Sequence, residues 1–216
     1  MPVHYEIIST GSQGNAVVFN NLLILDCGVS FRRIKPFLKD LRIVLLTHIH
    51  SDHFNKATIK QIAKNRPLVR FGCGEWLVSD LMECGVARNR IDVFKEGERY
   101  DYGLFALSPV FLTHNVPNLG YKLFFPDGSV FYATDCANLN GISAPGFDLY
   151  MVEANHTEED IENRIRAKKE TGEFAYEIQA KQNHLSKEQC DAFIYANIKT
   201  GGEFVYLHCH IDKGGG

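Results

Sequence analysis

Short apolar runs alternate with polar or glycine-containing segments along the chain. In the first half, this pattern predicts strands over residues 7–8, 16–19, 22–25 and 42–46. Asn20-Asn21 is typical of a tight hairpin between the second and third of these strands. Helices are expected over residues 30–38, capped by Ser30, and over residues 54–64, where apolar side chains fall near helical spacing. The first half is therefore predicted to alternate strands with helices.

The second half is richer in predicted strands, which cover residues 104–107, 110–112, 120–125, 130–133, 149–152 and 204–207. Pro109 separates the first two of these segments. Helices are expected over residues 157–169 and 186–198, the second with Ser186 as its cap and Glu188 near the capping-box position. Strand meanders with intervening helices favour an α/β fold in which sheets pack face to face with helices outside.

Length and composition are ordinary for a soluble domain. The chain has 216 residues, of which 45% are hydrophobic and 23% charged, so one domain over residues 1–216 is expected. A net charge of −3 argues against a generally basic nucleic-acid binder, although a local basic patch is compatible with it. The six cysteines form no CxxC pair, and neither a signal peptide nor a membrane span is recognisable. These features predict a cytoplasmic protein with reduced thiols and no membrane partner.

The candidate chemistry begins directly after the apolar run at residues 43–46. Three imidazoles and one carboxylate follow within six positions, as His48, His50, Asp52 and His53. Such side chains suit zinc, with manganese or iron as alternatives. They are more ligands than one tetrahedral site would take from a single loop. The stretch therefore predicts two divalent metal ions and a metal-dependent hydrolase.

Several predicted strands end in an ionisable residue, namely His48, His114, Asp135, Glu153 and His208. Strand ends on one edge of a sheet meet in space, so these distant residues can share a site. We predict a first metal on His48, His50 and His114, a second on Asp52, His53 and His208, and Asp135 as the bridge between them. Two metals about 3.5–4 Å apart can activate a bridging water or hydroxide and hold a phosphoryl oxygen.

Plainer interpretations stand beside these roles. His114 could be an ordinary loop histidine, and Asp135 could be a turn residue. His210 lies two positions after His208 and is an alternative last ligand. Asp26 closes a strand, where it either forms a turn or hydrogen-bonds a ligand histidine.

His184 also has two interpretations. It stands two residues before a predicted helix cap, Ser186, and could be a surface histidine there. Its functional interpretation is a group that assists the leaving oxygen or stabilises the phosphate.

The HxHxDH signature at residues 48–53, followed in order by His114, Asp135 and His208, resembles that of the metallo-β-lactamase superfamily. The resemblance covers nearly the whole chain. It implies a four-layer αββα sandwich with a dinuclear site between the sheets. True β-lactamases usually place a cysteine where Asp135 stands, so antibiotic hydrolysis is not expected.

Within the superfamily, the chain most resembles the WalJ (YycJ) group and, more distantly, ribonuclease Z. Four segments carry this likeness, at residues 9–15, 23–30, 153–156 and 183–186. The resemblance gives His184 an acid or phosphate-stabilising role, and gives Glu153 and His156 a supporting role. WalJ-group members are associated with DNA exonuclease activity. The chain departs from the group in the mixed charges of residues 162–182, and no long tRNA-gripping arm is evident, which disfavours tRNA processing.

The leading hypothesis is a phosphodiesterase that acts on nucleic acid, as a WalJ-like DNA exonuclease. A metal-bridging hydroxide would attack phosphorus, and catalysis is expected to depend on Asp52, Asp135 and His184. The substrate-binding residues are not identified. The positive charges that bind the substrate would come from Arg32, Arg33 and Lys35 or from residues 164–169, although both runs could equally be solvated helix surfaces.

Two other functions compete with this hypothesis. A small-molecule hydrolase, such as a cyclic-nucleotide phosphodiesterase, would need a closed pocket with an aromatic side chain such as Tyr121, Phe125 or Trp76 to stack on the base. A metal-binding module without activity is the third possibility, and the complete set of ligand candidates argues against it. The sequence leaves the oligomeric state open.

Overall fold

The computed structural model describes residues 3–209, and its strands form two six-stranded sheets. The first sheet has the order β1-β2-β3-β4-β5-β6. These strands are Tyr5–Ser9, Ala16–Phe19, Leu23–Leu25, Ile43–Leu45, Arg70–Cys73 and Ile91–Val93. The second sheet has the order β12-β11-β10-β9-β8-β7. In chain order from β7 to β12, its strands are Tyr100–Asp101, Ala106–Leu112, Asn118–Phe125, Gly128–Ala133, Leu149–Glu153 and Glu203–Leu207.

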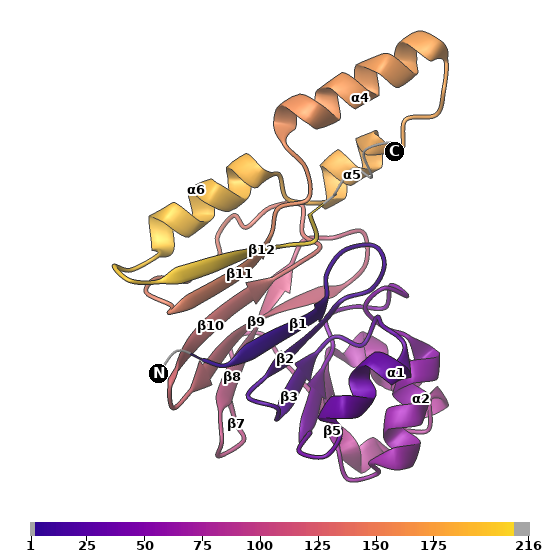
Figure 1. Cartoon of the computed structure of the whole chain (residues 1–216), viewed down its shortest axis with the longest axis vertical. Coiled ribbons are helices and arrows are strands. Elements are labelled where there is room, and N and C mark those ends of the chain that lie inside the picture. The colour runs from indigo at the N-terminus through magenta and orange to yellow at the C-terminus, as the bar shows by residue number, and fades with distance from the viewer. Residues whose placement is uncertain (1–2, 210–216) are drawn as a thin grey trace.

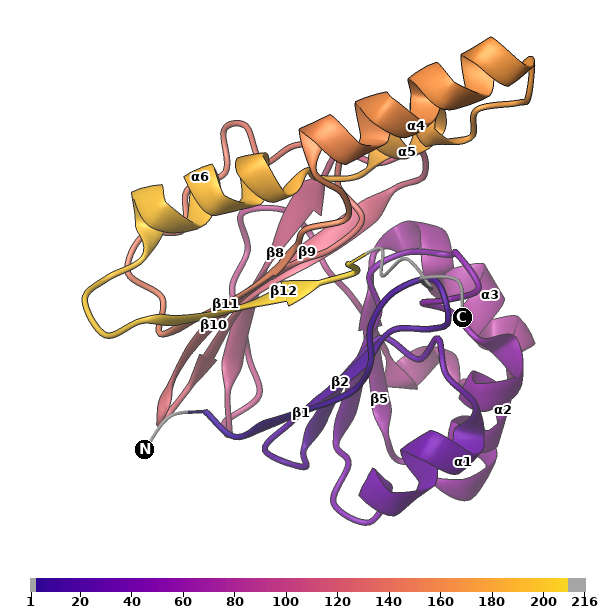
Figure 2. The same cartoon turned by 45° about the horizontal axis from the view of Figure 1, so that its top comes forward.

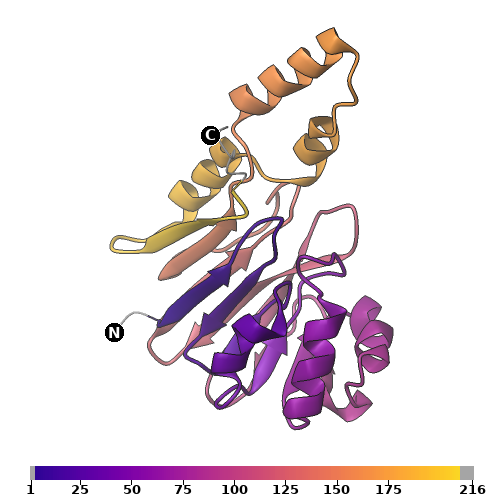
Figure 3. The ribbon, with the colours of Figure 1, turned by 45° about the vertical axis from the view of Figure 1, so that its right-hand side comes forward.

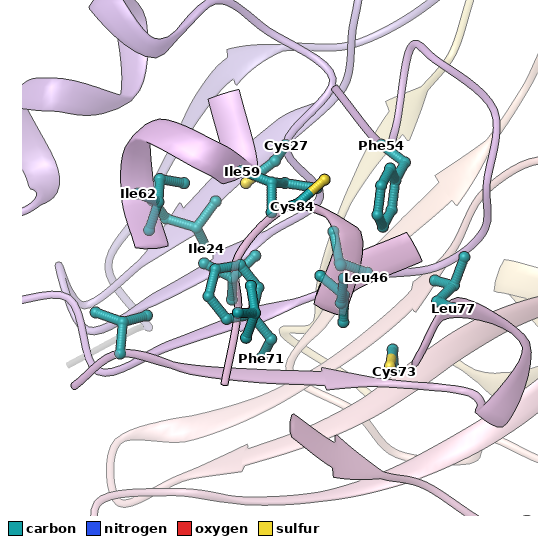
Figure 4. Packing of buried hydrophobic residues seen from close by; sticks show 14 of the residues in the cluster. Ile24, Cys27, Leu46, Phe54, Ile59, Ile62, Phe71, Cys73, Leu77 and Cys84 are labelled. Carbon is teal, nitrogen blue, oxygen red and sulfur yellow. The ribbon is translucent and has the colours of Figure 1, made fainter. Parts of the chain in front are cut away.

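Helices cover the outer face of the first sheet. They are α1 (Phe31–Ile34), η1 (Lys35–Phe37), α2 (Lys56–Asn65), η2 (Glu75–Leu77), α3 (Val78–Glu83) and η3 (Arg88–Arg90). Helix α2 turns Ile59 and Ile62 inward, where they pack with Ile24 and Phe71 of the sheet (Figure 4). This apolar face fixes α2 to the sheet and leaves its polar face in solvent.

The second sheet carries α6 (Lys187–Asn197) on its outer face, above a core that includes Ile194 and Phe131. Two further helices, α4 (Glu158–Thr171) and α5 (Glu177–Asn183), lie beyond the strand ends (Figures 1 and 3). We call residues 157–183 the α4–α5 arm. Among the described residues, no helix is long and apolar enough to cross a membrane.

The two sheets face each other across a third core (Figure 2). Tyr121 has no exposed surface there, and its hydroxyl donates to the Leu46 carbonyl at 2.5 Å. Phe125 is also buried, against Phe19. The expectation that Tyr121 or Phe125 could stack on a bound base is therefore wrong, because both rings fill the space between the sheets. The four layers run helix, sheet, sheet, helix, which confirms the expected sandwich.

Most predicted elements are confirmed. The hairpin at Asn20-Asn21 places both residues at positive φ, 50° and 55°, which asparagine tolerates better than most residues. The predicted break at Pro109 is wrong, since β8 runs through it. Strand β7 pairs only with Ala106 and Leu107, so β8 is an edge strand at Pro109 and needs no donor on that side.

The helix starts differ from the prediction in detail. Ser186 caps α6 as expected, but the partner in its capping box is Gln189 rather than Glu188. Ser30 precedes α1 without a hydrogen bond from its side chain, and the helix continues as the 3₁₀ turn η1. Helices α3 and α5 and strands β5, β6 and β7 are not predicted by the sequence pattern.

Strand direction explains how distant residues reach one edge. Strands β8 and β10 both pair antiparallel with β9, whereas β11 and β12 are parallel to β10. All four strands therefore end at the same edge of the second sheet. The loop after β4 reaches this edge from the first sheet, since the Thr47 carbonyl accepts a hydrogen bond from Leu119 N of β9 at 3.2 Å.

Candidate metal centre

The loop that follows β4, residues 47–53, is held by backbone contacts and is called the histidine loop here. Asp52 O accepts hydrogen bonds from Asn15 N at 2.6 Å and from Asn15 Nδ2 at 3.2 Å. Gly28 lies against the same carbonyl, and a Cβ at residue 28 would stand 1.6 Å from that oxygen. Only glycine fits at this position. The close packing of Gly28 against Asp52 therefore fixes the Asp26–Gly28 turn against the histidine loop.

Three histidines converge at one end of the histidine loop. His48 Nε2 lies 3.0 Å from His50 Nδ1, and His114 Nε2 lies 3.4 Å from the same atom. His114 Nδ1 is 3.0 Å from the Asn183 carbonyl, which orients the ring. Burial lowers the pKa of His48 to about 2 and also lowers that of His114. Burial thus favours the neutral form of His48 and His114, which is the form of imidazole that binds a metal ion.

His53 lies between two buried carboxylates. Its Nδ1 is 2.7 Å from Asp26 Oδ2, and its Nε2 is 2.6 Å from Asp135 Oδ2. Burial disfavours the imidazolium, but Asp135 and Asp26 outweigh it and raise the pKa of His53 well above its usual value. A positive charge is therefore favoured between these carboxylates, and a metal cation beside Nε2 would provide one.

Asp135 connects the two sides of the site. The backbone at Asp135 and at His208 has positive φ, 54° and 49°, which is strained for these residues and turns each side chain at its strand end. His208 Nδ1 lies 2.8 Å from Asp135 Oδ1, but this buried nitrogen has no hydrogen-bond partner among the described residues. Two ligand atoms that approach closely without donor–acceptor alignment fit a shared metal ion.

Glu153 and His184 form a pair beside Asp135. His184 Nδ1 is 2.6 Å from Glu153 Oε1 and 3.3 Å from Asp135 Oδ1. Glu153 Oε2 accepts from the backbone N–H groups of Cys136 at 2.9 Å and Leu185 at 3.3 Å. Burial opposes protonation, but Glu153 and then Asp135 raise the pKa of His184. The carboxylate thus fixes both the turn that carries Asp135 and the imidazole of His184.

Among residues 3–209, three groups of side chains meet the spacing that a metal ion needs: His48, His50 and His114; His48, His53 and Asp135; and Asp135, Glu153, His184 and His208. All the predicted strand-end residues fall in these groups. Asp52 does not, although its Oδ2 lies 3.7 Å from His53 Nε2. His210 lies outside the described residues.

Two predicted supporting residues have different places. Asp26 contacts His53 directly and also accepts from Thr47 N at 2.9 Å. His156 lies further out, with Nδ1 3.4 Å from Asn155 Oδ1, and its backbone carbonyl accepts from Lys187 N at 2.7 Å. Within residues 3–209, the His156 side chain makes no hydrogen bond or ion pair with the other candidate site residues.

Sequence reasoning missed Asn15 and Thr10. Asn15 Nδ2 lies 2.8 Å from His53 Nε2, and Thr10 Oγ1 accepts from His208 N at 2.7 Å. Both belong to the glycine-rich turn after β1, which reaches both sheets. The glycines around Asn15 were a signal of a tight turn, but not of its contacts.

A cavity of about 530 Å³ opens between this site and the α4–α5 arm. His184 and His208 line it on the metal side, and Ile161, Tyr176 and Ala180 line it on the arm side. The arm thus forms one wall of a space next to the candidate metal ligands.

The fold and the histidine clusters are those of a metal-binding hydrolase superfamily. The chain belongs to the metallo-β-lactamase superfamily, since the model of the Beta-lactamase superfamily domain matches residues 20–189. Members of this superfamily commonly bind two metal ions.

Among proteins of known sequence, the chain is similar to Exodeoxyribonuclease WalJ of Streptococcus pneumoniae. The two sequences are 24% identical over an aligned length of 233 residues. The alignment covers 97% of this chain and 81% of that protein. At this identity, the likeness supports the family and leaves the substrate open.

Three solved structures share the fold. YhfI from Bacillus subtilis has a TM-score of 0.73 at 14% identity, covering 98% of this chain and 88% of that one. The short form of human tRNase Z has a TM-score of 0.67 at 15% identity, covering 95% and 92%. Zn²⁺-bound PqqB from Methylobacterium extorquens has a TM-score of 0.68 at 14% identity, covering 95% and 88%.

Proposed function

We propose that the protein is a metal-dependent phosphodiesterase that acts on nucleic acid, as a DNA exonuclease similar to WalJ. The observation that carries this proposal is the Glu153–His184 pair, whose imidazole lies 3.3 Å from Asp135 at the candidate metal centre. Metal ligands and a proton donor side by side suit phosphodiester hydrolysis, and this arrangement supports assigning both roles here. The names of the WalJ and tRNase Z relatives, which denote nucleases, support the same substrate class.

The metal ligands in this proposal are divided between two ions, of which zinc suits the donors best. His48, His50 and His114 would hold the first ion. Asp52, His53 and His208 would hold the second, and Asp135 would contact both. Bound ions of this kind lower the pKa of water and stabilise negative charge on a phosphoryl oxygen.

The residues of the chain perform the remaining steps. Glu153 holds Nδ1 of His184, so Nε2 is the nitrogen that can give a proton to the leaving oxygen. The raised pKa of His184 favours its protonated form before the reaction. Asp26 orients His53 through Nδ1, which leaves Nε2 directed at Asp135.

A second candidate is a phosphodiesterase for small molecules such as cyclic nucleotides. The cavity beside His184 favours it, since about 530 Å³ lies within the range of small-molecule pockets. Tyr176 and Tyr206 line this cavity, so aromatic side chains other than Tyr121 and Phe125 could contact a base.

The two candidates are separated by assaying the zinc-loaded protein on two substrate sets. The first set is end-labelled single- and double-stranded DNA, and the second is a panel of cyclic nucleotides. Progressive loss of nucleotides from DNA ends, abolished in Asp135→Ala, is the expected result. Turnover of a cyclic nucleotide with intact DNA would favour the second candidate. Inactivity on both sets, with two metals bound, would contradict both.

A further inference from the structure

Positive charge is concentrated in one segment of the chain. Nine of the 23 lysine and arginine residues lie within residues 30–66, together with only two carboxylates, Asp40 and Asp52. This segment has a net charge of +7 although the whole chain carries −3, so the remainder is strongly acidic. The segment contains α1, η1, the histidine loop and α2.

The fold places these helices side by side on the outer face of the first sheet (Figures 2 and 3). Arg66, which follows α2, donates to the carbonyls of Lys39 at 2.6 Å and Leu41 at 3.3 Å. At the other end, Thr58 donates to the Val29 carbonyl at 2.6 Å. These contacts tie the segments before α1 and after η1 to the two ends of α2.

Five basic side chains on these helices and in the turn after η1 are exposed and have no ion pair or side-chain hydrogen bond among residues 3–209. They are Arg32, Lys35, Lys39, Lys60 and Lys64, which we call the basic face. Lys60 and Lys64 lie one helical turn apart, about 6 Å. Lys56 does not belong to this set, because it pairs with Asp80 at 2.7 Å and Glu83 at 3.5 Å.

The basic face begins next to the candidate metal centre. Helix α2 starts at Lys56, three residues after His53, and α1 starts at Phe31, three residues after Gly28. Gly28 packs against the histidine loop at Asp52. A polyanion that lies along α1 and α2 would therefore reach the histidine loop at its end.

The α4–α5 arm, the other basic run near the site, is a poorer binding surface. It contains seven carboxylates and five basic residues. Lys168 pairs with Glu177 at 2.8 Å, and Lys181 pairs with Glu158 at 3.2 Å and Glu162 at 2.8 Å. Because carboxylates outnumber basic residues in the arm and hold Lys168 and Lys181 in ion pairs, the arm offers little positive potential to a phosphate backbone.

We propose that the basic face binds the phosphate backbone of a nucleic acid and so presents the end of the strand to the histidine loop. The proposal rests on the nucleic-acid substrate class of the proposed function and assigns it a docking surface. Lysine and arginine side chains would contact phosphates without reading bases, so binding would depend on salt and not on sequence.

The test is fluorescence anisotropy with the full-length, zinc-loaded protein and a labelled 20-base-pair duplex whose phosphorothioate linkages slow hydrolysis. We compare Lys60→Glu/Lys64→Glu and Arg32→Glu/Lys35→Glu with a control of equal charge change, Lys95→Glu/Lys169→Glu. Lys95 and Lys169 are exposed and lie outside the basic face, Lys169 on the arm. Thermal melting of each variant checks that it folds.

Each double variant of the basic face is expected to bind about 10-fold more weakly near 0.1 M salt, and to reduce the slope of log K against log salt by about two. The control should retain most of the wild-type affinity. Equal losses in all three variants, or no loss in the two basic-face variants, would overturn the proposal. So would a wild-type protein that binds anionic vesicles but not DNA.

Binding and cleavage are measured separately, so the two proposals can fail independently. A protein that degrades DNA but binds it equally well in all variants would refute the docking surface alone. A protein that binds DNA through Lys60 and Lys64 but hydrolyses no phosphodiester would refute the proposed function alone.

Discussion

The candidate centre has two halves that are built differently. The first-sheet half comes from one continuous loop, and His53 within it has no exposed surface and is held by Asp26 and Asn15. The second-sheet half comes from separate strand ends and the turn before α6, and 20% of the His184 side chain is exposed beside the cavity. The buried half is suited to fixing a cation, and the open half to exchanging a proton with a substrate.

The largest effect is expected where the halves meet. Asp135→Ala removes the carboxylate that contacts His53 at 2.6 Å and His208 at 2.8 Å. Phosphodiesterase activity should fall at least about 10⁴-fold, because several kcal/mol of transition-state stabilisation by the metal pair would be lost. Activity assays with metal analysis by mass spectrometry measure this. Full activity with two bound metals would show that the halves work without Asp135.

Next in size is the open half alone. His184→Ala should lower kcat about 10²- to 10³-fold, since a general acid typically contributes this much. The metal content should remain at the wild-type level, because His184 is not among the proposed ligands. Loss of a metal ion in this variant would instead assign His184 to the metal site, together with Asp135, Glu153 and His208.

The buried half is tested by a smaller change. Asp26→Asn keeps the shape of a side chain at φ 62°, which asparagine tolerates, and removes the charge beside His53. Metal affinity should fall about 10- to 100-fold, as for other partners of metal-bound histidines. Calorimetric titration with zinc checks this.

A matched control for this change is Asp92→Asn, which removes a carboxylate bound to Arg70 and Tyr102 away from the site. Its zinc affinity should equal that of the wild type. Equal zinc affinities for the wild type, Asp26→Asn and Asp92→Asn would mean that Asp26 stabilises its turn and does not contribute to metal binding.

The smallest effect concerns the support of the open half. Ser186 caps α6 with a full capping box, two residues after His184. Ser186→Ala should reduce the free energy of unfolding by about 1 kcal/mol, the usual cost of a lost cap. Denaturant titration measures this change. An unchanged midpoint would show that the cap does not stabilise this end of the helix.

The two halves of the candidate centre also differ in how far the sequence could predict them. The histidine loop is a local pattern after an apolar strand, so its residues and their proximity follow from a few adjacent letters. The strand-end residues needed one further rule, that strands in the same direction end at one edge. The directions of β8, β10, β11 and β12 make this rule hold, and so bring His114, Asp135 and His208 together.

Other features depend on contacts that no local pattern encodes. Asn15 reaches His53 across 38 positions of sequence. The α4–α5 arm has strong helical sequence in α4, with Thr157 as its cap, but its place beyond the strand ends depends on the rest of the fold.

The most direct test of the account is anomalous diffraction from zinc-soaked crystals, measured on both sides of the zinc absorption edge. We expect two peaks about 3.5–4 Å apart, one beside His48, His50 and His114 and the other beside His53, Asp135 and His208. A single peak enclosed by Asp135, Glu153, His184 and His208 would contradict the account, because the open half would then hold the metal and His184 could not serve as the proton donor.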